Sequence, residues 1–344
     1  MFPIFLSSFF LSIFGIFTVL GVKSSLLLVQ FSHFIIAVAV FFIMKKIGKN
    51  FFQVNSKLFY WLFVFILLIT FFIGLEVKGS KRWIDFYLFR FQASEFFKSF
   101  FILFFANYFA RRPVGETKLF YFLKSIIFLI IPVVIIFKQP DLGNALVYSF
   151  IFLMMIIFSK VPKKYLFTGL IFSIIIAPIG FMILKDYQKD RLISFINPQI
   201  DTQGTAYNMI QSIITVGSGK FWGRGLGYGT QSRLAFLPEN HTDFAYSSLV
   251  EQFGFIGGIV VVLLFCFLVF SLINRAIKYY FQKDDESRIN FLYLVGFISY
   301  LIFHIFINVG MNLGIFPITG ITLPFISYGG SSTMAILIGF ALMP

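Results

Sequence analysis

Long uninterrupted runs of apolar residues recur from one end of the chain to the other. They extend over approximately residues 2–22, 25–44, 58–75, 96–110, 119–137, 142–159, 165–184, 244–273, 289–309 and 332–343. About 20 apolar residues in a helix cross the hydrocarbon core of a bilayer, which is roughly 30 Å thick. The pattern therefore predicts an all-α polytopic membrane protein with about ten transmembrane helices.

Polar residues gather in one long interruption between the seventh and eighth apolar runs. This segment, residues 185–243, is rich in Gly, Ser, Asn, Gln and Thr and also carries Lys and Arg. A connection of that length is usually functional or disordered. No soluble segment of similar size remains elsewhere. We therefore expect a single integral membrane domain, residues 1–344, with a large loop at 185–243.

The composition agrees with a lipid environment and changes the meaning of the charge. Hydrophobic residues make up 59% of the 344 residues, and charged residues make up 12%. A net charge of +14 would suggest nucleic-acid binding in a soluble protein, but these Lys and Arg lie mainly between the apolar runs. Membrane topology and anionic lipids explain that placement. Membrane lipids are therefore expected partners, and nucleic acid is not.

The basic residues also predict the orientation of the chain in the membrane. Lys and Arg concentrate in alternate connections, around residues 45–57, 111–124, 160–164 and 275–288. They outnumber those of the short connections between them, so the positive-inside rule makes these four connections and both termini cytoplasmic. The loop 185–243 is then extracytoplasmic. Any active site is expected on this outer face of the membrane.

Four spaced motifs combine polar residues and glycine in unusual ways. Residues 223–244 contain Gly-Thr-Gln-Ser and then Leu-Pro-Glu-Asn-His-Thr-Asp-Phe, and residues 79–98 end in Gln-Ala-Ser-Glu-Phe-Phe-Lys. Residues 138–143 read Lys-Gln-Pro-Asp-Leu-Gly, and residues 308–332 contain Pro-Ile-Thr-Gly and Leu-Pro-Phe-Ile-Ser-Tyr-Gly-Gly-Ser-Ser. Together they resemble the signature of the shape, elongation, division and sporulation (SEDS) family, whose best-known members are RodA and FtsW. Gly-Thr-Gln-Ser and Pro-Ile-Thr-Gly look more like RodA.

The resemblance implies a peptidoglycan glycosyltransferase of the bacterial cytoplasmic membrane. Such an enzyme transfers the growing undecaprenyl-linked glycan to lipid II with inversion, forms β-1,4 linkages and releases undecaprenyl pyrophosphate. A RodA-like member would act in cell elongation and shape maintenance, and an FtsW-like paralogue in division. The resemblance also implies a class B penicillin-binding protein, a transpeptidase, as partner.

Asp243 is the candidate catalytic base. The transfer needs a base for the attacking hydroxyl and positive charge near the departing pyrophosphate. Asp243 lies where the long loop enters the eighth apolar run, and the resemblance assigns catalysis to the matching Asp. The alternative is that Thr242 or Asp243 caps the following helix, and the two roles are compatible.

Glu95 and Lys98 are candidates for substrate binding. They stand three residues apart at the start of a predicted helix, so they share a face. An ordinary ion pair is the alternative interpretation, although a charged pair at the membrane boundary is costly unless it is used or well compensated. The resemblance places both residues in a cavity beside the catalytic Asp.

Basic outer residues are candidates for the pyrophosphate, because phosphate recognition favours Arg forks and Lys point charges. Contact with lipid headgroups is the alternative for each of them. Further substrate-binding candidates come from the motifs, and His241 could instead orient Asp243. The basic candidates are Lys81, Arg82, Arg224 and Arg233; the others are Gln231, Glu239, His241, Thr242, Ser327 and Ser331.

The sequence predicts no metal site, because His33 and His304 are isolated within apolar runs and His241 is the only histidine of its motif. No cofactor is predicted, and participation of a divalent cation is left open. Asp141 follows a proline at a helix entrance, where we interpret it as structural.

Two residues depart from the family pattern. Ala93 stands where Pro is usual, which affects only a helix start. Gln252 stands where a second acid usually follows Glu251, so no role is assigned to that pair.

Two other classes of function compete with an enzyme. About ten helices with intramembrane charges also fit a lipid II flippase or transporter. The motifs argue against this class, because they cluster on the outer side and not at the bilayer midplane. The third class is a non-catalytic scaffold that recruits the transpeptidase.

Overall fold

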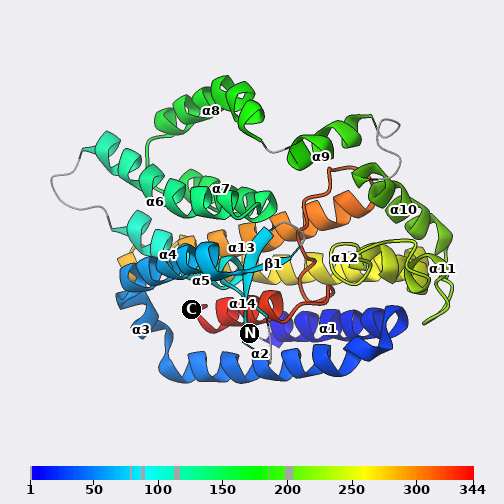
Figure 1. Ribbon diagram of the computed structural model, residues 1–344. Coiled ribbons are helices and arrows are strands. Elements are labelled where there is room, and N and C mark those ends of the chain that lie inside the picture. Colours follow the sequence, from blue (N-terminus) through cyan, green and yellow to red (C-terminus); the bar gives the residue numbers. More distant parts are fainter. Residues whose placement is uncertain (1, 78–79, 87–89, 112–116, 185, 198–203) are drawn as a thin grey trace. The chain divides into compact units, whose positions relative to one another are not determined.

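The computed structural model describes residues 2–77, 80–86, 90–111, 117–184, 186–197 and 204–344 (Figure 1). Gly79 of one motif, Arg112 and Lys185 among the basic residues, and residues 198–203 of the long loop lie outside the described residues. The helices are α1 (Phe2–Val22), η1 (a 3-10 helix, Ser24–Leu26), α2 (Leu27–Ile47), α3 (Lys49–Val54), α4 (Ser56–Ile73), α5 (Ala93–Ala110), α6 (Lys118–Lys138), α7 (Leu142–Ile157), α8 (Lys163–Ile183), α9 (Asp186–Ile196), α10 (Thr205–Ser218), α11 (Thr230–Arg233), α12 (Ala245–Tyr280), α13 (Asp285–Asn312) and α14 (Gly330–Ala341).

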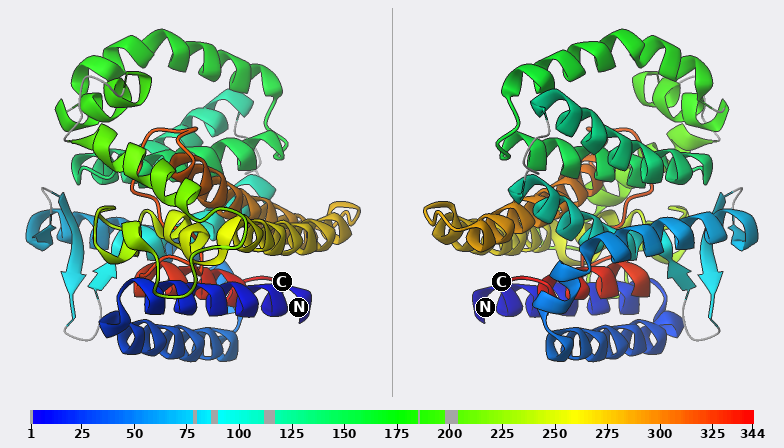
Figure 2. Two further views of the ribbon diagram at one scale, coloured as in Figure 1. Left: turned by 90° about the vertical axis from the view of Figure 1, so that its right-hand side faces the viewer. Right: turned by 90° about the vertical axis from the view of Figure 1, so that its left-hand side faces the viewer.

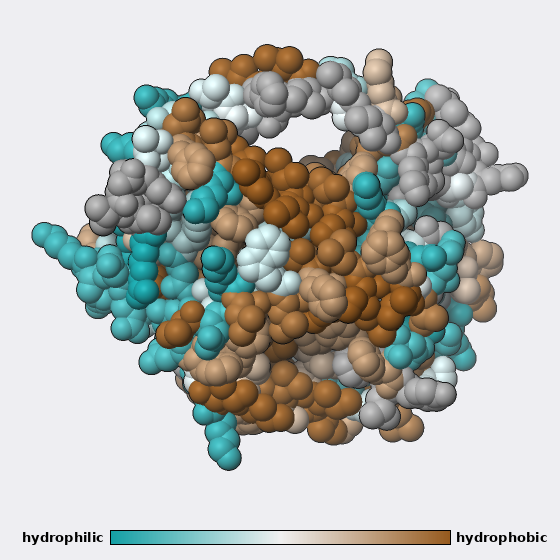
Figure 3. Space-filling model, turned by 60° about the vertical axis from the view of Figure 1, so that its left-hand side comes forward, coloured by the Kyte–Doolittle hydropathy of each residue, from teal (hydrophilic) through white to brown (hydrophobic). Residues whose placement is uncertain are grey.

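Each predicted apolar run coincides with a helix. Among the described residues, six helical segments are long and apolar enough to cross a membrane, namely Phe2–Val22, Ser24–Ile47, Ser56–Ile73, Lys118–Lys138, Ala245–Tyr280 and Asp285–Asn312. Large apolar side chains remain exposed on them, and apolar atoms cover much of the face drawn in Figure 3. Apolar surface of that extent faces lipid. The predicted polytopic, mostly helical membrane protein is confirmed, and the number of spans stays a prediction.

A small antiparallel sheet lies where the sequence predicted only a connection between helices. Its strands are β1 (Leu75–Val77), β2 (Ser80–Asp85) and β3 (Arg90–Gln92), in the order β1-β2-β3 (Figure 2). Trp83 on β2 pairs with Leu75 on one side and Gln92 on the other. Strands of this length are too short for an alternating pattern to stand out in the sequence.

The long polar loop also contains structure that its composition did not predict. Helices α9, α10 and α11 all lie within it. The motif at residues 308–332 includes a stretch of irregular backbone. Residues 313–329 contain no helix or strand, and α14 begins at Gly330.

The chain divides into two compact units. Unit 1 comprises Met1–Phe31, Phe167–Leu268 and His304–Gly329, and unit 2 comprises Ser32–Leu166, Val269–Phe303 and Gly330–Pro344. A single integral membrane domain therefore stays a prediction.

The core of unit 2 is built around α5, which is not among the six candidate membrane-crossing segments and is almost completely enclosed by protein. Its residues from Ala93 to Ala106 are all buried, and it packs against α4, α7 and α14. Phe97 illustrates the packing, with ring contacts to Tyr60, Phe63 and Tyr148. Because α5 is surrounded by protein, it can carry charged residues that a lipid-facing helix could not.

In unit 1, α1 packs closely against the irregular segment 313–329. The contact depends on Gly15, because a Cβ at this position would lie 2.2 Å from the carbonyl oxygen of Phe325. The same segment contacts the turn that precedes α12, through Ser327 and Tyr328. These contacts bring the motif at residues 308–332 next to the one at residues 223–244.

Candidate functional site

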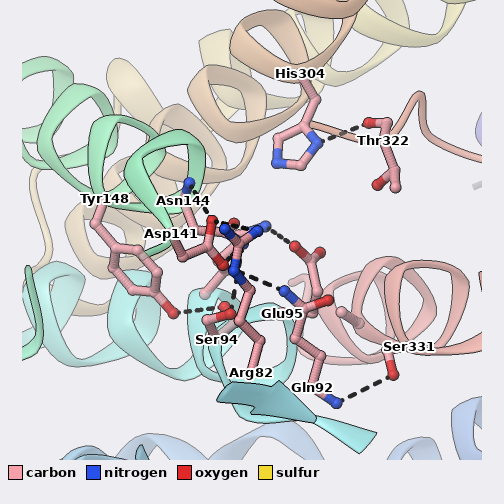
Figure 4. Close-up of polar contacts among 12 residues, drawn as sticks. Arg82, Gln92, Ser94, Glu95, Asp141, Asn144, Tyr148, His304, Thr322 and Ser331 are labelled. Carbon is pink, nitrogen blue, oxygen red and sulfur yellow. Dashed lines mark hydrogen bonds and ion pairs between the residues drawn. The ribbon is translucent and has the colours of Figure 1, made fainter. Parts of the chain in front are cut away.

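Asp141 is the centre of a polar cluster in unit 2 (Figure 4). It precedes α7 and accepts a hydrogen bond from the backbone N–H of Asn144 at 3.2 Å. Its second oxygen accepts from the side-chain amides of Asn144 at 2.9 Å and of Gln92 at 3.3 Å. Asp141 therefore caps α7, which agrees with its interpretation as a structural residue.

Arg82 reaches this cluster from strand β2. Its Nη1 lies 3.5 Å from Asp141 Oδ1. The guanidinium also donates to the carbonyl oxygens of Gln139, at 3.4 Å, and Pro140. These partners hold Arg82 at the junction of α6 and α7, so several of its N–H donors are already engaged.

Glu95 and Lys98 form the predicted pair on one face of α5. Lys98 Nζ donates to Glu95 Oε1 at 2.6 Å, and both side chains are almost completely buried. The ammonium also lies 5.1 Å from the centre of the Tyr300 ring, which suits a cation–π contact. Glu95 Oε2 is buried and has no hydrogen-bond partner among the described residues. The pair thus retains a free acceptor.

Ser331 lies beside the same sheet, at the start of α14. Its hydroxyl donates to the carbonyl of Arg90 at 2.5 Å and accepts from the backbone N–H of Gln92 at 3.2 Å. The hydroxyl proton is therefore committed to the backbone, and Ser331 joins strand β3 to α14.

In unit 1, the first motif ends in a tight turn before α12. The backbone N–H groups of Thr242 and Phe244 both donate to the carbonyl of Glu239, at 3.2 and 3.1 Å. Thr242 Oγ1 also donates to Glu239 Oε2 at 2.9 Å. Helix α12 begins at Ala245, so Phe244 occupies the position directly before it.

Asp243 is held in place through its backbone carbonyl. Two asparagines of α13, one helical turn apart, donate to this oxygen: Asn308 at 3.0 Å and Asn312 at 3.1 Å. Both asparagines are fully buried. The Asp243 side chain is only half-buried, and its Oδ2 would lie 3.6 Å from a Cβ placed on Gly320.

The irregular segment 313–329 forms the other wall of this turn. Ser327 Oγ donates to the carbonyl of Thr242 at 2.6 Å and accepts from the backbone N–H of Leu323 at 2.8 Å. The N–H of Tyr328 donates to the carbonyl of His241 at 2.7 Å, and the two rings are in edge contact. The backbone carbonyls of residues 241–243 therefore all accept hydrogen bonds, from α13 and from the segment 313–329.

Glu251 is a buried carboxylate that the sequence analysis did not assign to the site. It lies on α12 and is fully buried. Its Oε1 accepts from the N–H of Gln231 at 2.8 Å and from Ser218 Oγ at 3.2 Å. Its Oε2 accepts from the N–H and the hydroxyl of Ser232, at 2.9 and 2.6 Å. Four neutral donors thus compensate the charge and attach the Gly-Thr-Gln-Ser motif to α12.

Gln252 stands where the family usually has an acid, and its neutral amide makes a contact of its own. Its Nε2 donates to the carbonyl of Thr18 on α1 at 3.2 Å, which an ionised carboxylate could not do. A Cβ at Gly21 would lie 2.0 Å from Gln252 Oε1. The neutral side chain therefore joins α12 to α1.

The remaining candidates are peripheral. Arg224 and Arg233 are exposed and donate to loop carbonyls, those of Ser218 and Gly227, at 3.1 Å in each case. Lys81 is exposed on β2. The described residues contain no group of three or more His, Cys, Asp or Glu that could hold a metal ion.

Comparison with known proteins connects these features to a family. The sequence profile of the FtsW/RodA/SpoVE family, described as "Cell cycle protein", matches residues 4–344. The chain belongs to this family. It is 34% identical over 317 residues to the probable peptidoglycan glycosyltransferase FtsW of Wigglesworthia glossinidia brevipalpis, covering 90% of this chain and 81% of that protein.

Two further proteins are similar over most of the chain. The peptidoglycan glycosyltransferase MrdB of Escherichia coli K12 is 31% identical over 271 residues, which cover 78% of this chain and 71% of that protein. A solved structure of a peptidoglycan synthase complex, concerned with the coordination of polymerization and crosslinking, shares the fold with a TM-score of 0.82 and 23% identity, covering 99% of this chain and 96% of that chain. The predicted family is confirmed.

The sequence motifs found most of these residues, and the structure groups them differently. Asp243, Glu239, His241, Thr242 and Ser327 meet in unit 1, whereas Arg82, Glu95, Lys98 and Ser331 belong to unit 2. Sequence reasoning missed Asn308, Asn312 and Glu251. The first two stand four residues apart within a motif, and that spacing on one helix face was the available signal.

The Glu95–Lys98 pair gives a first prediction. Lys98→Met should lower the stability of the purified protein by about 3–5 kcal/mol, because it leaves a buried carboxylate without its cation. Lys98→Met combined with Glu95→Gln should cost less than Lys98→Met alone. Thermal unfolding in one detergent would measure Lys98→Met, Glu95→Gln and the double variant. Additive losses would show that the two side chains do not depend on each other.

Glu251 gives a second prediction. Glu251→Ala leaves the buried N–H of Ser232 and the half-buried N–H of Gln231 unpaired and should cost on the order of 3 kcal/mol. Glu251→Gln should cost less, since the side-chain carbonyl oxygen of Gln can still accept hydrogen bonds. Ser218→Ala is the matched control, because it removes only the longest of the four bonds to Glu251, from a hydroxyl that also donates to the carbonyl of Thr215. Tm and the rate of proteolysis within residues 204–233 should follow this order, and a Ser218→Ala loss equal to that of Glu251→Ala would contradict it.

Proposed function

We propose that this protein is a peptidoglycan glycosyltransferase that polymerises lipid II into glycan strands. Its membership of the FtsW/RodA/SpoVE family supports this proposal, as do the names of relatives that cover most of the chain. The observation that carries it is the position of Asp243. Its main chain is fixed by Asn308 and Asn312, while its carboxylate lies in a half-buried position beside Gly320.

In the proposed reaction, Asp243 accepts the proton of the 4-hydroxyl of the acceptor sugar on lipid II. The resulting oxygen attacks the anomeric carbon of the growing strand from the face opposite the pyrophosphate. The bond from that carbon to the pyrophosphate oxygen breaks, and its electron pair leaves with undecaprenyl pyrophosphate. The new linkage is β-1,4, and Asp243 then releases the proton to water. General base catalysis of this kind contributes roughly 10²–10⁴-fold.

Positive charge for the leaving group comes from the basic residues of the motifs. Arg224 and Arg233 are the best candidates for this role, because their side chains are exposed and they lie near the Gly-Thr-Gln-Ser motif in the sequence. Lys81 is a further exposed candidate on β2. We assign Arg82 a positioning role instead, since its donors are engaged with the α6–α7 junction.

The buried polar residues divide between binding and positioning. The unpartnered oxygen of Glu95 supports a substrate contact, with Lys98 compensating its charge. The hydroxyl groups of Ser327 and Ser331 donate hydrogen bonds to backbone carbonyls, so we propose that these two residues position the backbone. Glu239, Thr242 and His241 shape the turn that presents Asp243. Gln231 attaches the preceding motif to α12 through Glu251.

We place the active site on the extracytoplasmic side, with both termini in the cytoplasm, because that orientation follows from the distribution of Lys and Arg. We also propose a class B penicillin-binding protein as partner. Support comes from the fold shared with a synthase complex in which polymerization and crosslinking are coordinated.

Asp243→Asn tests the catalytic assignment. The variant should lose at least about 10²-fold of its glycan synthesis from lipid II, because an amide cannot accept the proton. Asp190→Asn, an exposed carboxylate on α9 in the same unit, is the control and should retain full activity. Polymer length would be followed by gel separation of the products, with Tm showing that both variants fold. Equal polymer from Asp243→Asn and the unchanged protein would reject the base, and lipid II translocation without polymerisation would favour a flippase.

We propose a role in cell elongation, based on the Gly-Thr-Gln-Ser and Pro-Ile-Thr-Gly segments. Expression in Escherichia coli depleted of MrdB should restore rod shape. Expression in cells depleted of FtsW should leave them filamentous. Rescue of division without rescue of shape would assign the protein to division instead, and cell morphology distinguishes the two results.

A further inference from the structure

Helix α12 is broken near its beginning, at Gly254, where φ is +72° and ψ is −174°. The break leaves the next two backbone N–H groups without their usual helical acceptors. The preceding loop supplies acceptors instead. Phe255 N donates to the carbonyl of Lys220 at 2.9 Å, and Ile256 N donates to that of Phe221 at 3.3 Å.

The same loop also satisfies the carbonyl groups on the other side of the break. Arg224 N donates to the carbonyl of Glu251 at 2.9 Å, and Gly225 N donates to that of Gln252 at 3.0 Å. In an unbroken helix these two carbonyls would accept from the amides four residues later. The loop therefore replaces two helical hydrogen bonds with four bonds of its own.

Close approach of the two backbones requires two glycines. A Cβ at Gly254 would lie 2.3 Å from the backbone nitrogen of Gly223, and a Cβ at Gly223 would lie 2.2 Å from the carbonyl oxygen of Gln252. Both glycines also have positive φ, +72° and +85°. The junction is thus built into the sequence at these two positions.

The surroundings of α12 change at this break. Before it, residues 245–252 are all buried, and they include polar side chains such as Ser247, Ser248 and Glu251. After it, large apolar side chains four residues apart are exposed along one face, namely Phe255, Ile259, Leu263 and Phe267. A polar section enclosed by protein is thus followed by an apolar section that faces outward.

The length of the apolar section matches a bilayer. No charged residue occurs between Glu251 and Arg275. About 20 helical residues, at 1.5 Å each, cross a hydrocarbon core of roughly 30 Å. Counting back from Arg275 by that number places the other boundary of the core at Phe255, next to the break.

Exposed aromatic side chains gather at the same level. The Phe221 ring contacts the rings of Trp222, at 5.4 Å, and Phe255, at 6.1 Å. All three are exposed, Trp222 to 79%. Lys220 and Arg224, on either side, are exposed as well. Aromatic rings concentrate where the hydrocarbon core meets the headgroups, and Lys or Arg there lie at the level of lipid phosphates.

We propose that Phe221, Trp222 and Phe255 form an aromatic collar that rests on the bilayer at the boundary between the hydrocarbon core and the headgroups. The side is the extracytoplasmic one under the topology proposed above. The polar section of α12 and Asp243 then lie outside the hydrocarbon core, at the level of the polar part of a lipid-linked sugar. The evidence for the collar is the break in α12 and the exposed rings, and it does not depend on the reaction proposed for Asp243.

The fluorescence of Trp222 tests the collar. The chain has three tryptophans, so Trp61→Phe with Trp83→Phe leaves Trp222 as the only emitter. This variant is placed in phosphatidylcholine–phosphatidylglycerol vesicles whose acyl chains carry bromine either near the headgroup or near the chain end. Bromine near the headgroup should quench Trp222 at least about twofold more than bromine near the chain end, and aqueous iodide should quench it weakly. A variant that retains only Trp83, on strand β2, is the control and should respond little to brominated lipid.

Two outcomes would overturn the proposal. Strong quenching by iodide with none by brominated lipid would place Trp222 in water, and weak quenching by both would show that protein covers it. If the single-tryptophan variant does not fold, a spin label supplies the same information. Cys266 is the only cysteine, so the variant Trp222→Cys with Cys266→Ser accepts one spin label. Dissolved oxygen should enhance the relaxation of this label more than a water-soluble nickel chelate does. A stronger effect of the chelate would reject the collar.

Discussion

The structure depends on one constraint, which is that backbone polar groups surrounded by apolar material must find partners within the protein. Long helices satisfy it by themselves, and the difficult positions are those where helices stop. There the chain uses side-chain amides and hydroxyls. Asn308 donates both to the carbonyl of Asp243 and to that of Ile321, and Ser327 serves the carbonyl of Thr242. The residues around the catalytic candidate are therefore positioned by the same contacts that allow irregular backbone to exist there.

The two units treat buried carboxylates in different ways. In unit 2, Glu95 is compensated by a full positive charge on Lys98 and keeps one oxygen unpaired. In unit 1, Glu251 is compensated by four neutral donors, two of them backbone N–H groups. A carboxylate whose oxygens are saturated is suited to holding a loop. One with a spare acceptor is suited to contacting a ligand.

The sequence predicted the helices well because an apolar run long enough to cross a bilayer rarely adopts any structure but a membrane helix. It also predicted that Glu95 and Lys98 share a helix face, since they stand three residues apart, and that Asp141 is structural. The sheet was missed because its strands contain only three to six residues. Asn312 and Glu251 were missed for another reason. Their roles arise from contacts with residues 69 and 19 to 33 positions away, and local spacing shows at most a shared helix face, not the distant partner.

The hydrogen bonds between residues 220–225 and the break in α12 have a mechanical consequence. The four backbone hydrogen bonds all join residues 220–225 to residues 251–256, so a displacement of this loop strains all four. Bonds arranged in this way resist shear as a group, and the loop and the first turns of the helix must move as one rigid piece. A partner that pulled on residues 220–225 would thus move the start of α12 directly.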